Sequence, residues 1–172
     1  MEIKRLLSLD AFRGFTIAAM IVVNFPGSWS HVYPPLLHAK WNGLTPTDLI
    51  FPFFIFIVGV SIALAYTKLI RKGVSKKYLH GKILFRSLKI FVVGLLLNYI
   101  HHFKLSELRY AGVLQRIAIV FLACSLLFLH FRWIWQLLAG AGLLIFYWLA
   151  MTLIPTPGHQ SVMLEPGINL AA

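Results

Sequence analysis

The stretch that decides the fold is Leu49-Ile-Phe-Pro-Phe-Phe-Ile-Phe-Ile-Val-Gly-Val-Ser-Ile-Ala-Leu-Ala-Tyr66, and no charged residue follows it until Lys68. An α-helix needs about 20 mostly apolar residues to cross the roughly 30 Å hydrocarbon core of a bilayer. The stretch does not alternate between apolar and polar residues, as the strands of a membrane barrel do. Because lipid offers the backbone no hydrogen bonds, we expect this stretch to be a transmembrane helix.

The whole chain shares this apolar character. Of its 172 residues, 59% are hydrophobic and only 12% are charged, and the mean hydropathy is +0.81. Soluble domains usually carry about a quarter charged residues. The composition therefore excludes a soluble enzyme, a disordered basic tail and a disulfide scaffold. The only cysteine, Cys124, cannot form an intrachain disulfide.

Five segments are suited to crossing a membrane, namely 8–25, 47–67, 84–101, 111–130 and 133–154. The sequence therefore predicts an all-α integral membrane fold, a helical bundle of about five transmembrane helices. We expect 1–172 to form a single transmembrane domain, in which 155–172 is an external loop or tail. Because only this loop follows the fifth span, we expect the chain to be truncated, the first part of a larger bundle.

The charges are strongly unbalanced, with 16 Lys and Arg against 5 Asp and Glu, a formal net charge of +11. Nucleic-acid-binding proteins carry such a charge on a polar exterior, whereas here it lies between apolar runs. With five crossings, eleven basic residues fall on one side, three on the other, and two within spans. The positive-inside rule then places the N-terminus and the 68–89 loop in the cytoplasm, and we expect a bacterial inner membrane.

Two ionisable residues lie within the first span. Asp10 and Arg13 are three residues apart, so on a helix they share a face and can pair. In one interpretation they anchor the helix at the interface, with Arg13 extending to the headgroups. In the other they form a buried pair that shapes a polar site, because ionisable groups in spans usually face a bundle interior or a cavity. The sequence leaves both open.

A second polar segment, His38-Ala-Lys-Trp-Asn-Gly-Leu-Thr-Pro-Thr-Asp48, precedes the second span. Asp48 or Thr47 is placed to cap that helix, and for Asp48 capping is favoured over catalysis. His38 is a candidate catalytic residue, because imidazole titrates near neutral pH and acts as a base or as a nucleophile toward acyl groups. From spacing alone, a simply exposed loop histidine is the commoner interpretation.

A third polar segment begins the fourth span, where Gln115 and Arg116 lie beside small residues that allow helices to approach closely. We expect Arg116 to pair inside the bundle or to hold an anionic group. Four histidines fall on the outer side in this topology, namely His31, His38, His101 and His102. They lack the spacing of a metal-ligand motif, so we predict no metal site.

These segments resemble those of the heparan-alpha-glucosaminide N-acetyltransferase family of multi-span membrane acyltransferases. The similarity lies in Ser8-Leu-Asp-Ala-Phe-Arg-Gly14, in the 38–48 segment running into Phe51-Pro-Phe-Phe-Ile-Phe-Ile-Val-Gly-Val-Ser61, and in Gly112-Val-Leu-Gln-Arg-Ile-Ala118. In order and on matching spans, these segments cover most of the first 120 residues. The family often has Ile-Pro where this chain has Tyr110-Ala111, which removes a helix-start proline. The family's second half supplies further spans.

The resemblance implies transfer of an acetyl or similar acyl group from cytoplasmic acyl-CoA to an amine or hydroxyl of a sugar or glycan on the outer side. Acetyl-CoA is the implied donor, and the family's active histidine corresponds to His38. The residues expected to shape a polar cavity for cofactor or substrate are Asp10, Arg13, Asn42, Asp48, Gln115 and Arg116. The expected partners are the lipid bilayer, acyl-CoA and a glycan acceptor, with no nucleic acid, and a homo-oligomer is left open.

Two other classes of protein remain compatible with these residues. In a transporter or flippase domain, Asp10, Arg13 and Arg116 would line a substrate path, since intramembrane charges often do. In an inactive truncated fragment they would have no catalytic role. Binding of acyl-CoA separates an enzyme from a transporter, because a transporter should be indifferent to it.

Overall fold

A computed structural model describes residues 6–40, 42–102, 112–156, 161–162, 164–165 and 168–170. Within them the chain forms five α-helices and a short 3₁₀ helix, in the order α1 (Leu7–Asn24), η1 (Pro34–Leu36), α2 (Pro46–Arg71), α3 (Lys76–His102), α4 (Val113–His130) and α5 (Trp133–Leu153). Each of the five α-helices is long and apolar enough to cross a membrane, and the described residues contain no strand. The predicted all-α fold with about five spans is confirmed.

Helix α3 begins eight residues before the predicted start at 84. Its first turns contain Lys76, Lys77, Lys82 and Arg86, which interrupt the apolar pattern but are good helix formers. Hydropathy therefore locates the apolar part of this helix and misses the basic turns that precede it. The predicted start of the fourth span, at 111, lies outside the described residues.

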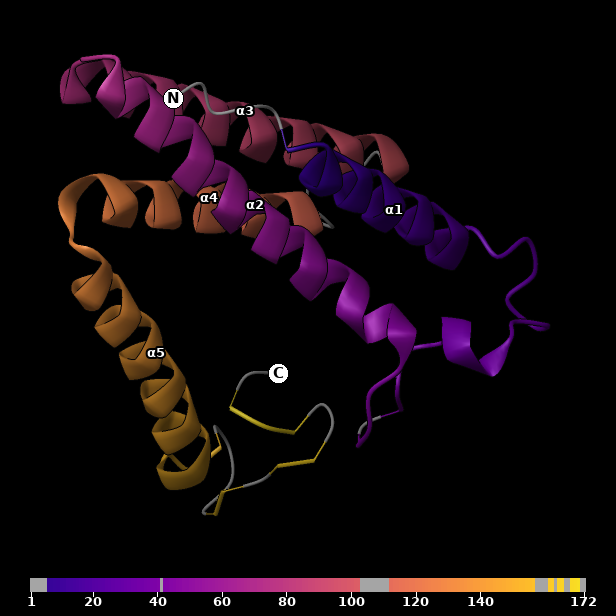
Figure 1. Cartoon of the computed structure of the whole chain (residues 1–172). Coiled ribbons are helices and arrows are strands. Elements are labelled where there is room, and N and C mark those ends of the chain that lie inside the picture. Colours follow the sequence, from indigo (N-terminus) through magenta and orange to yellow (C-terminus); the bar gives the residue numbers. More distant parts are fainter. Residues whose placement is uncertain are drawn as a thin grey trace. The chain divides into compact units, whose positions relative to one another are not determined.

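The chain divides into two compact units, Met1–Leu129 and His130–Ala172. In the first unit α1 packs on α2 (Figure 1). The rings of Phe12 and Phe53 meet there edge to face, with their centroids 5.5 Å apart. Helix α2 ends at Arg71, and Gly73 just beyond it has a φ of +74°, the left-handed conformation that closes many helices. The short turn that follows leads directly into α3.

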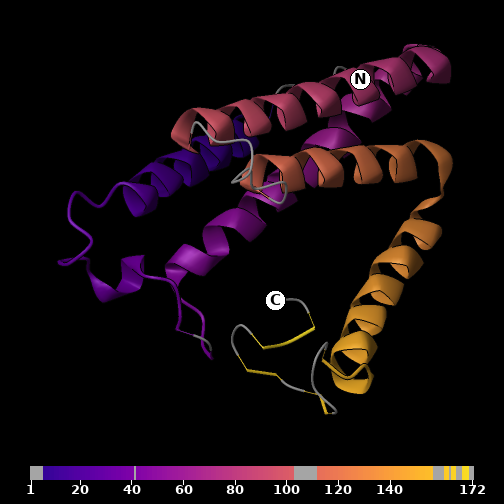
Figure 2. The same cartoon turned by 180° about the vertical axis from the view of Figure 1, so that it is seen from behind.

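The core of the first unit lies between α2, α3 and α4. Its buried side chains are Ile62 and Tyr66 of α2, Leu79 and Ile83 of α3, and Phe121 and Leu129 of α4. The Ser87 hydroxyl of α3 donates to the Ala118 carbonyl of α4 at 2.8 Å, and the two helices run beside each other in Figure 2. A hydroxyl bond of this kind joins helices where lipid provides no competing water.

The second unit contains α5, which has no buried residue. Its exposed aromatic side chains include Trp133 and Trp135 near one end and Tyr147 and Trp148 toward the other. Tryptophan and tyrosine are enriched where membrane helices meet the headgroups. The exposed apolar surface of this helix is therefore suited to lipid.

Helices α3 and α4 approach each other closely at Gly94. A Cβ atom at this position would lie 2.8 Å from the Cβ of Leu114 and 3.0 Å from the Cδ of Gln115. Real Cβ atoms do not come this close to a backbone-attached carbon, so only glycine fits. At Gly81, also on α3, a Cβ would meet nothing within 4 Å.

We predict that Gly94→Ala lowers the melting temperature of the detergent-solubilised protein, because the added methyl group overpacks the α3–α4 contact by about 1–3 kcal/mol. Gly81→Ala is the matched control, and it should leave stability unchanged or raise it by up to about 1 kcal/mol. Thermal unfolding followed by circular dichroism measures both. Equal melting temperatures for the two variants would show that the close contact at Gly94 is absent.

Candidate active site

The loop between α1 and α2 carries His38 back to the start of α2. Leu37, which follows η1, has an extended backbone, and the loop contains Gly43, whose φ of +128° is a conformation that residues with a side chain rarely adopt. The hydroxyl of Thr47, which is buried, donates to the Pro35 carbonyl at 3.2 Å and ties η1 to α2. Thr47, one of the two predicted capping residues, thus holds the loop in place.

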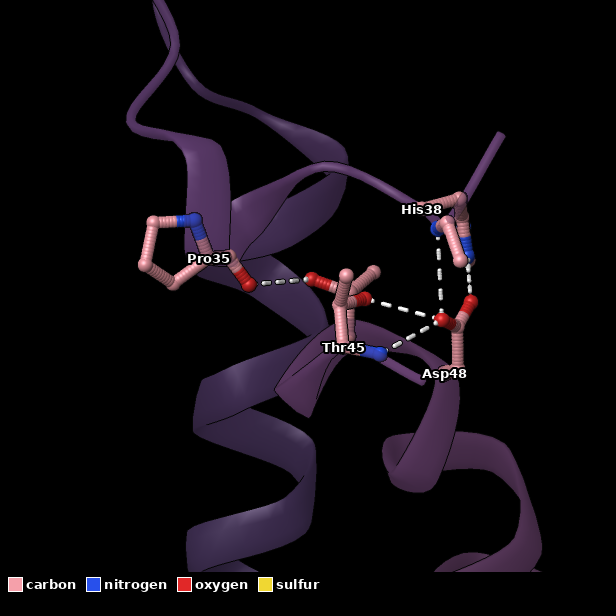
Figure 3. A network of polar contacts seen from close by, with 6 residues as sticks. Pro35, His38, Thr45 and Asp48 are labelled. Carbon is pink, nitrogen blue, oxygen red and sulfur yellow. Dashed lines mark hydrogen bonds and ion pairs between the residues drawn. The ribbon is translucent and has the colours of Figure 1, made fainter. Parts of the chain in front are cut away.

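Asp48 joins the loop to the helix. One oxygen of its carboxylate, Oδ1, lies 2.6 Å from Nδ1 of His38 (Figure 3). The other, Oδ2, accepts from the backbone N–H and the hydroxyl of Thr45, both at 2.9 Å, and from the Ala39 N–H at 3.3 Å. The bond from the Thr45 N–H to the third helical residue is one half of a capping box. Capping and orienting the histidine are therefore done by the two oxygens of the same side chain.

This arrangement determines which nitrogen of His38 is available. An ionised carboxylate can only accept hydrogen bonds, so the nitrogen that faces it, Nδ1, carries the proton. In the neutral ring the other nitrogen, Nε2, then has a free lone pair. The His38 side chain is 73% exposed and that of Asp48 is 24% exposed, so a substrate can reach the ring while its orienting partner is shielded.

His38 lines a pocket of about 200 Å³ with residues of α1, α2 and α4, which we term the histidine pocket. Its polar side chains are Asn24 at the end of α1, His38, Thr47 and Arg116 near the start of α4, and the remaining lining is apolar. Asn24 donates from Nδ2 to the Met20 carbonyl at 2.7 Å. The fold thus brings together His38 and Arg116, which are 78 positions apart in the sequence.

Arg116 gives this pocket a positive charge. Its side chain is exposed and has no ion-pair partner in the part of the chain that the structure describes. Of the two expectations for Arg116, pairing within the bundle is therefore not seen among the described residues. A guanidinium beside a histidine can hold an anionic group or stabilise negative charge that develops on a carbonyl oxygen.

Asn24 was not among the residues predicted from the sequence. An asparagine at the end of an apolar run, just before Pro26-Gly27, is typical of a helix terminus at the membrane interface. Only the packing of α1 against α2, together with the returning loop, places Asn24 beside His38. The one sign of this in the sequence is that Asn24 lies at the same end of the first span as the loop that carries His38.

Asp10 and Arg13 form the ion pair that their spacing predicts. Arg13, however, lies eleven residues before Asn24 on α1, which is about 16 Å along a helix. It lines a different pocket, together with residues of α2, α3 and α4. The pair is therefore not part of the histidine pocket.

The last two predicted residues also lie apart from His38. Gln115 of α4 is only 1% exposed, and its side chain packs against Gly94 of α3. Its Nε2 has no hydrogen-bond partner among the described residues. Asn42 is exposed on the loop and lines none of the pockets described above. No three His, Cys, Asp or Glu side chains gather as a metal site within the described ranges.

Fold and site together define a membrane protein whose helices surround a pocket with an arginine and a carboxylate-oriented histidine. The family described as "Heparan-alpha-glucosaminide N-acetyltransferase, catalytic" matches residues 5–166, and the chain belongs to this family. The human heparan-alpha-glucosaminide N-acetyltransferase is 34% identical over 193 residues, covering 95% of this chain and 28% of the human protein. The mouse protein of the same name is 38% identical over 127 residues, covering 72% of this chain and 19% of the mouse protein. The chain thus spans less than a third of the length of either relative.

We predict that Asp48→Ala lowers the free energy of unfolding by about 1 kcal/mol, because the Thr45 donors at the start of α2 lose their acceptor. Asp48→Asn is the matched control, since its amide oxygen can still accept from Thr45, and its stability should stay within about 0.5 kcal/mol of the wild type. Thermal unfolding in detergent measures both. Unchanged stability in the alanine variant would contradict the capping role.

Proposed function

We propose that this chain supplies the histidine-bearing part of a membrane acetyltransferase, which moves an acetyl group from cytoplasmic acyl-CoA to an amine or hydroxyl of a sugar on the other side. The observation that carries the proposal is the 2.6 Å contact between His38 and Asp48 beside Arg116, in a chain of the N-acetyltransferase family. The curated relatives bear the name of an acetyltransferase of a glucosaminide, and we extend that chemistry to this chain.

In this proposal Nε2 of His38 is the reacting atom, and two routes use it. In one, Nε2 attacks the thioester carbonyl, the carbon–sulfur bond breaks, and CoA leaves as a thiolate. The acceptor amine then attacks the acyl-imidazolium, the bond from the acyl carbon to Nε2 breaks, and the proton that the amine loses passes to the CoA thiolate. In the other, Nε2 removes a proton from the acceptor while that acceptor attacks the thioester directly, the carbon–sulfur bond breaks, and the ring passes the proton to the departing CoA thiolate. In both routes Asp48 stabilises the positive charge that the ring acquires.

Arg116 and Asn24 have supporting roles in either route. Both routes place negative charge on the carbonyl oxygen of the thioester, and the Arg116 guanidinium lines the same pocket as His38. The amide of Asn24 is suited to position the acceptor or the acyl group by hydrogen bonding. Asn42, Gln115, Asp10 and Arg13 remain candidates for binding rather than for the chemical step.

The charge distribution supports an acyl donor that enters at the opposite end of the helices. His38 lies at the N-terminal end of α2, whereas Lys68, Arg71 and Lys72 lie at its C-terminal end. The helix has 26 residues, so these ends are about 39 Å apart. With the basic end in the cytoplasm, as the positive-inside rule requires, His38 faces the outer side. The donor or its acyl group must then pass along the bundle.

We predict that His38→Ala reduces acetyl transfer by at least about 100-fold, because general-base or nucleophilic catalysis of this kind contributes about 10²–10⁴-fold. The assay uses membranes that contain the full-length gene product, with labelled acetyl-CoA and an amino sugar. His31→Ala is the matched control, since His31 is exposed on the same loop and bonds to Ser30 instead of to a carboxylate. Equal transfer by wild type and His38→Ala would remove His38 from the mechanism.

The orientation is testable by labelling with a membrane-impermeant maleimide. In a Cys124→Ser background, Lys40→Cys should react in intact cells, whereas Lys77→Cys should react only after the cells are permeabilised. Both positions are exposed and carry a lysine, so the two variants are matched. The reverse pattern of labelling would place His38 in the cytoplasm and contradict transfer across the membrane.

A further inference from the structure

A second pocket, of about 250 Å³, lies among α1, α2, α3 and α4, and its lining includes basic residues of α3. Three cationic side chains line it, Arg13 of α1 and Lys82 and Arg86 of α3, and we term it the cationic pocket. The hydroxyl-bearing residues Ser61 and Tyr66 and several apolar residues of α2 and α4 complete the lining. None of the three cations has a role in the chemistry proposed for His38.

The positive charge of this pocket is incompletely balanced. Arg13 pairs with Asp10, but Lys82 and Arg86 have no carboxylate partner among the described residues. The two residues are four apart on α3, so they occupy the same face and repel each other. Both side chains are exposed, and an anion between them would remove this repulsion.

Arg86 is held in a defined position. Its guanidinium carbon lies 5.0 Å from the centroid of the Phe121 ring of α4, within the range of a cation–π contact. A planar guanidinium fixed on an aromatic face keeps its N–H groups available at the ring's edge and loses little entropy on binding. Guanidinium groups favour phosphate because two N–H groups can donate to two of its oxygens.

The rest of the lining indicates what is attached to the phosphate. Apart from the cations and the hydroxyl-bearing residues the lining is apolar, and Ile62 of α2 and Phe121 of α4 belong to the buried core. Along α4, Ile117 of this pocket directly follows Arg116 of the histidine pocket. Along α2, Val58 of the cationic pocket lies seven residues from Phe51 of the histidine pocket, which is about 10 Å. A long chain anchored in the cationic pocket can therefore extend toward His38.

We propose that the cationic pocket binds the phosphate ester of a molecule whose remaining part is long and apolar or extended. Two sources share this chemistry, the phosphorylated end of acyl-CoA and the headgroup of an anionic phospholipid. For the acyl-CoA source the inference rests on the proposed function. For the lipid source it is independent of that function.

Binding by matched variants tests the proposal. The full-length gene product is placed in nanodiscs of phosphatidylcholine, and binding of CoA, or of pantetheine as a probe without phosphate, is measured by thermal shift. In nanodiscs that contain phosphatidylglycerol, native mass spectrometry measures the lipid retained. Lys89→Gln is the control for Arg86→Gln, because Lys89 is on the same helix but lies over the Phe85 ring at 4.3 Å, outside the pocket lining.

Arg86→Gln should weaken binding of CoA or of phosphatidylglycerol by at least about tenfold, the effect of losing a hydrogen bond between charged groups. Lys82→Gln should act in the same direction, Arg86→Lys should recover part of the loss, and Lys89→Gln should change binding by less than about twofold. Loss confined to CoA identifies the cofactor as the occupant, and loss confined to phosphatidylglycerol identifies the lipid. Pantetheine binding should not respond to Arg86→Gln.

Equal losses in Arg86→Gln and Lys89→Gln would overturn the proposal, because they would show diffuse attraction by the basic surface. Absence of binding of both phosphate compounds to the wild type would also overturn it. These outcomes are separate from a failure of the proposed function, which is judged from acetyl transfer by the His38 variants. Normal transfer together with unaltered phosphate binding in Arg86→Gln would reject this inference alone.

Discussion

The candidate site depends on the carboxylate of Asp48. Its Oδ2 accepts three hydrogen bonds from Ala39 and Thr45, and its Oδ1 faces Nδ1 of His38. A carboxylate near lipid is costly unless donors surround it, and here the donors are those that the start of α2 must satisfy. Formation of the helix start therefore also fixes the orientation of the histidine.

The other side of the histidine pocket depends on the packing of the helix bundle. Arg116 is placed by α4, whose position against α3 is set by the close approach at Gly94 and by the bond from Ser87 to Ala118. None of the described side chains of α3 lines the histidine pocket, yet α3 determines where α4 can lie. Neighbouring side chains on α4 then face different surroundings, because successive positions on a helix point about 100° apart. Gln115 is buried against α3 while Arg116 lines the pocket.

Much of the fold follows from the sequence, because a bilayer allows few alternatives. The apolar runs had to be helices, and their number and order were predictable from hydropathy. The basic first turns of α3 were not, since their residues favour a helix but lack the apolar pattern on which the prediction relied. Where residues favour a helix but lack the apolar pattern, hydropathy alone places the start of the helix too late.

The site was predictable only in part. His38 and Asp48 belong to one short segment, and their contact needs only the local turn at Gly43. Asn24 and Arg116 join them through tertiary packing, which no spacing in the sequence reveals. Asp10 and Arg13 were grouped with His38 because all were polar residues at or within spans, although the rise of α1 alone separates Arg13 from the histidine end.

The central claim is that Asp48 holds His38 with its proton on Nδ1 and leaves Nε2 free. Nitrogen-15 NMR of the histidine-labelled protein in nanodiscs, with the His38 signals assigned by comparison with His38→Ala, measures this directly. At a pH where the ring is neutral, we predict a protonated Nδ1 and an unprotonated Nε2, and a loss of this preference in Asp48→Ala. A wild-type ring protonated at Nε2, or a tautomer unaffected by removal of Asp48, would contradict the account.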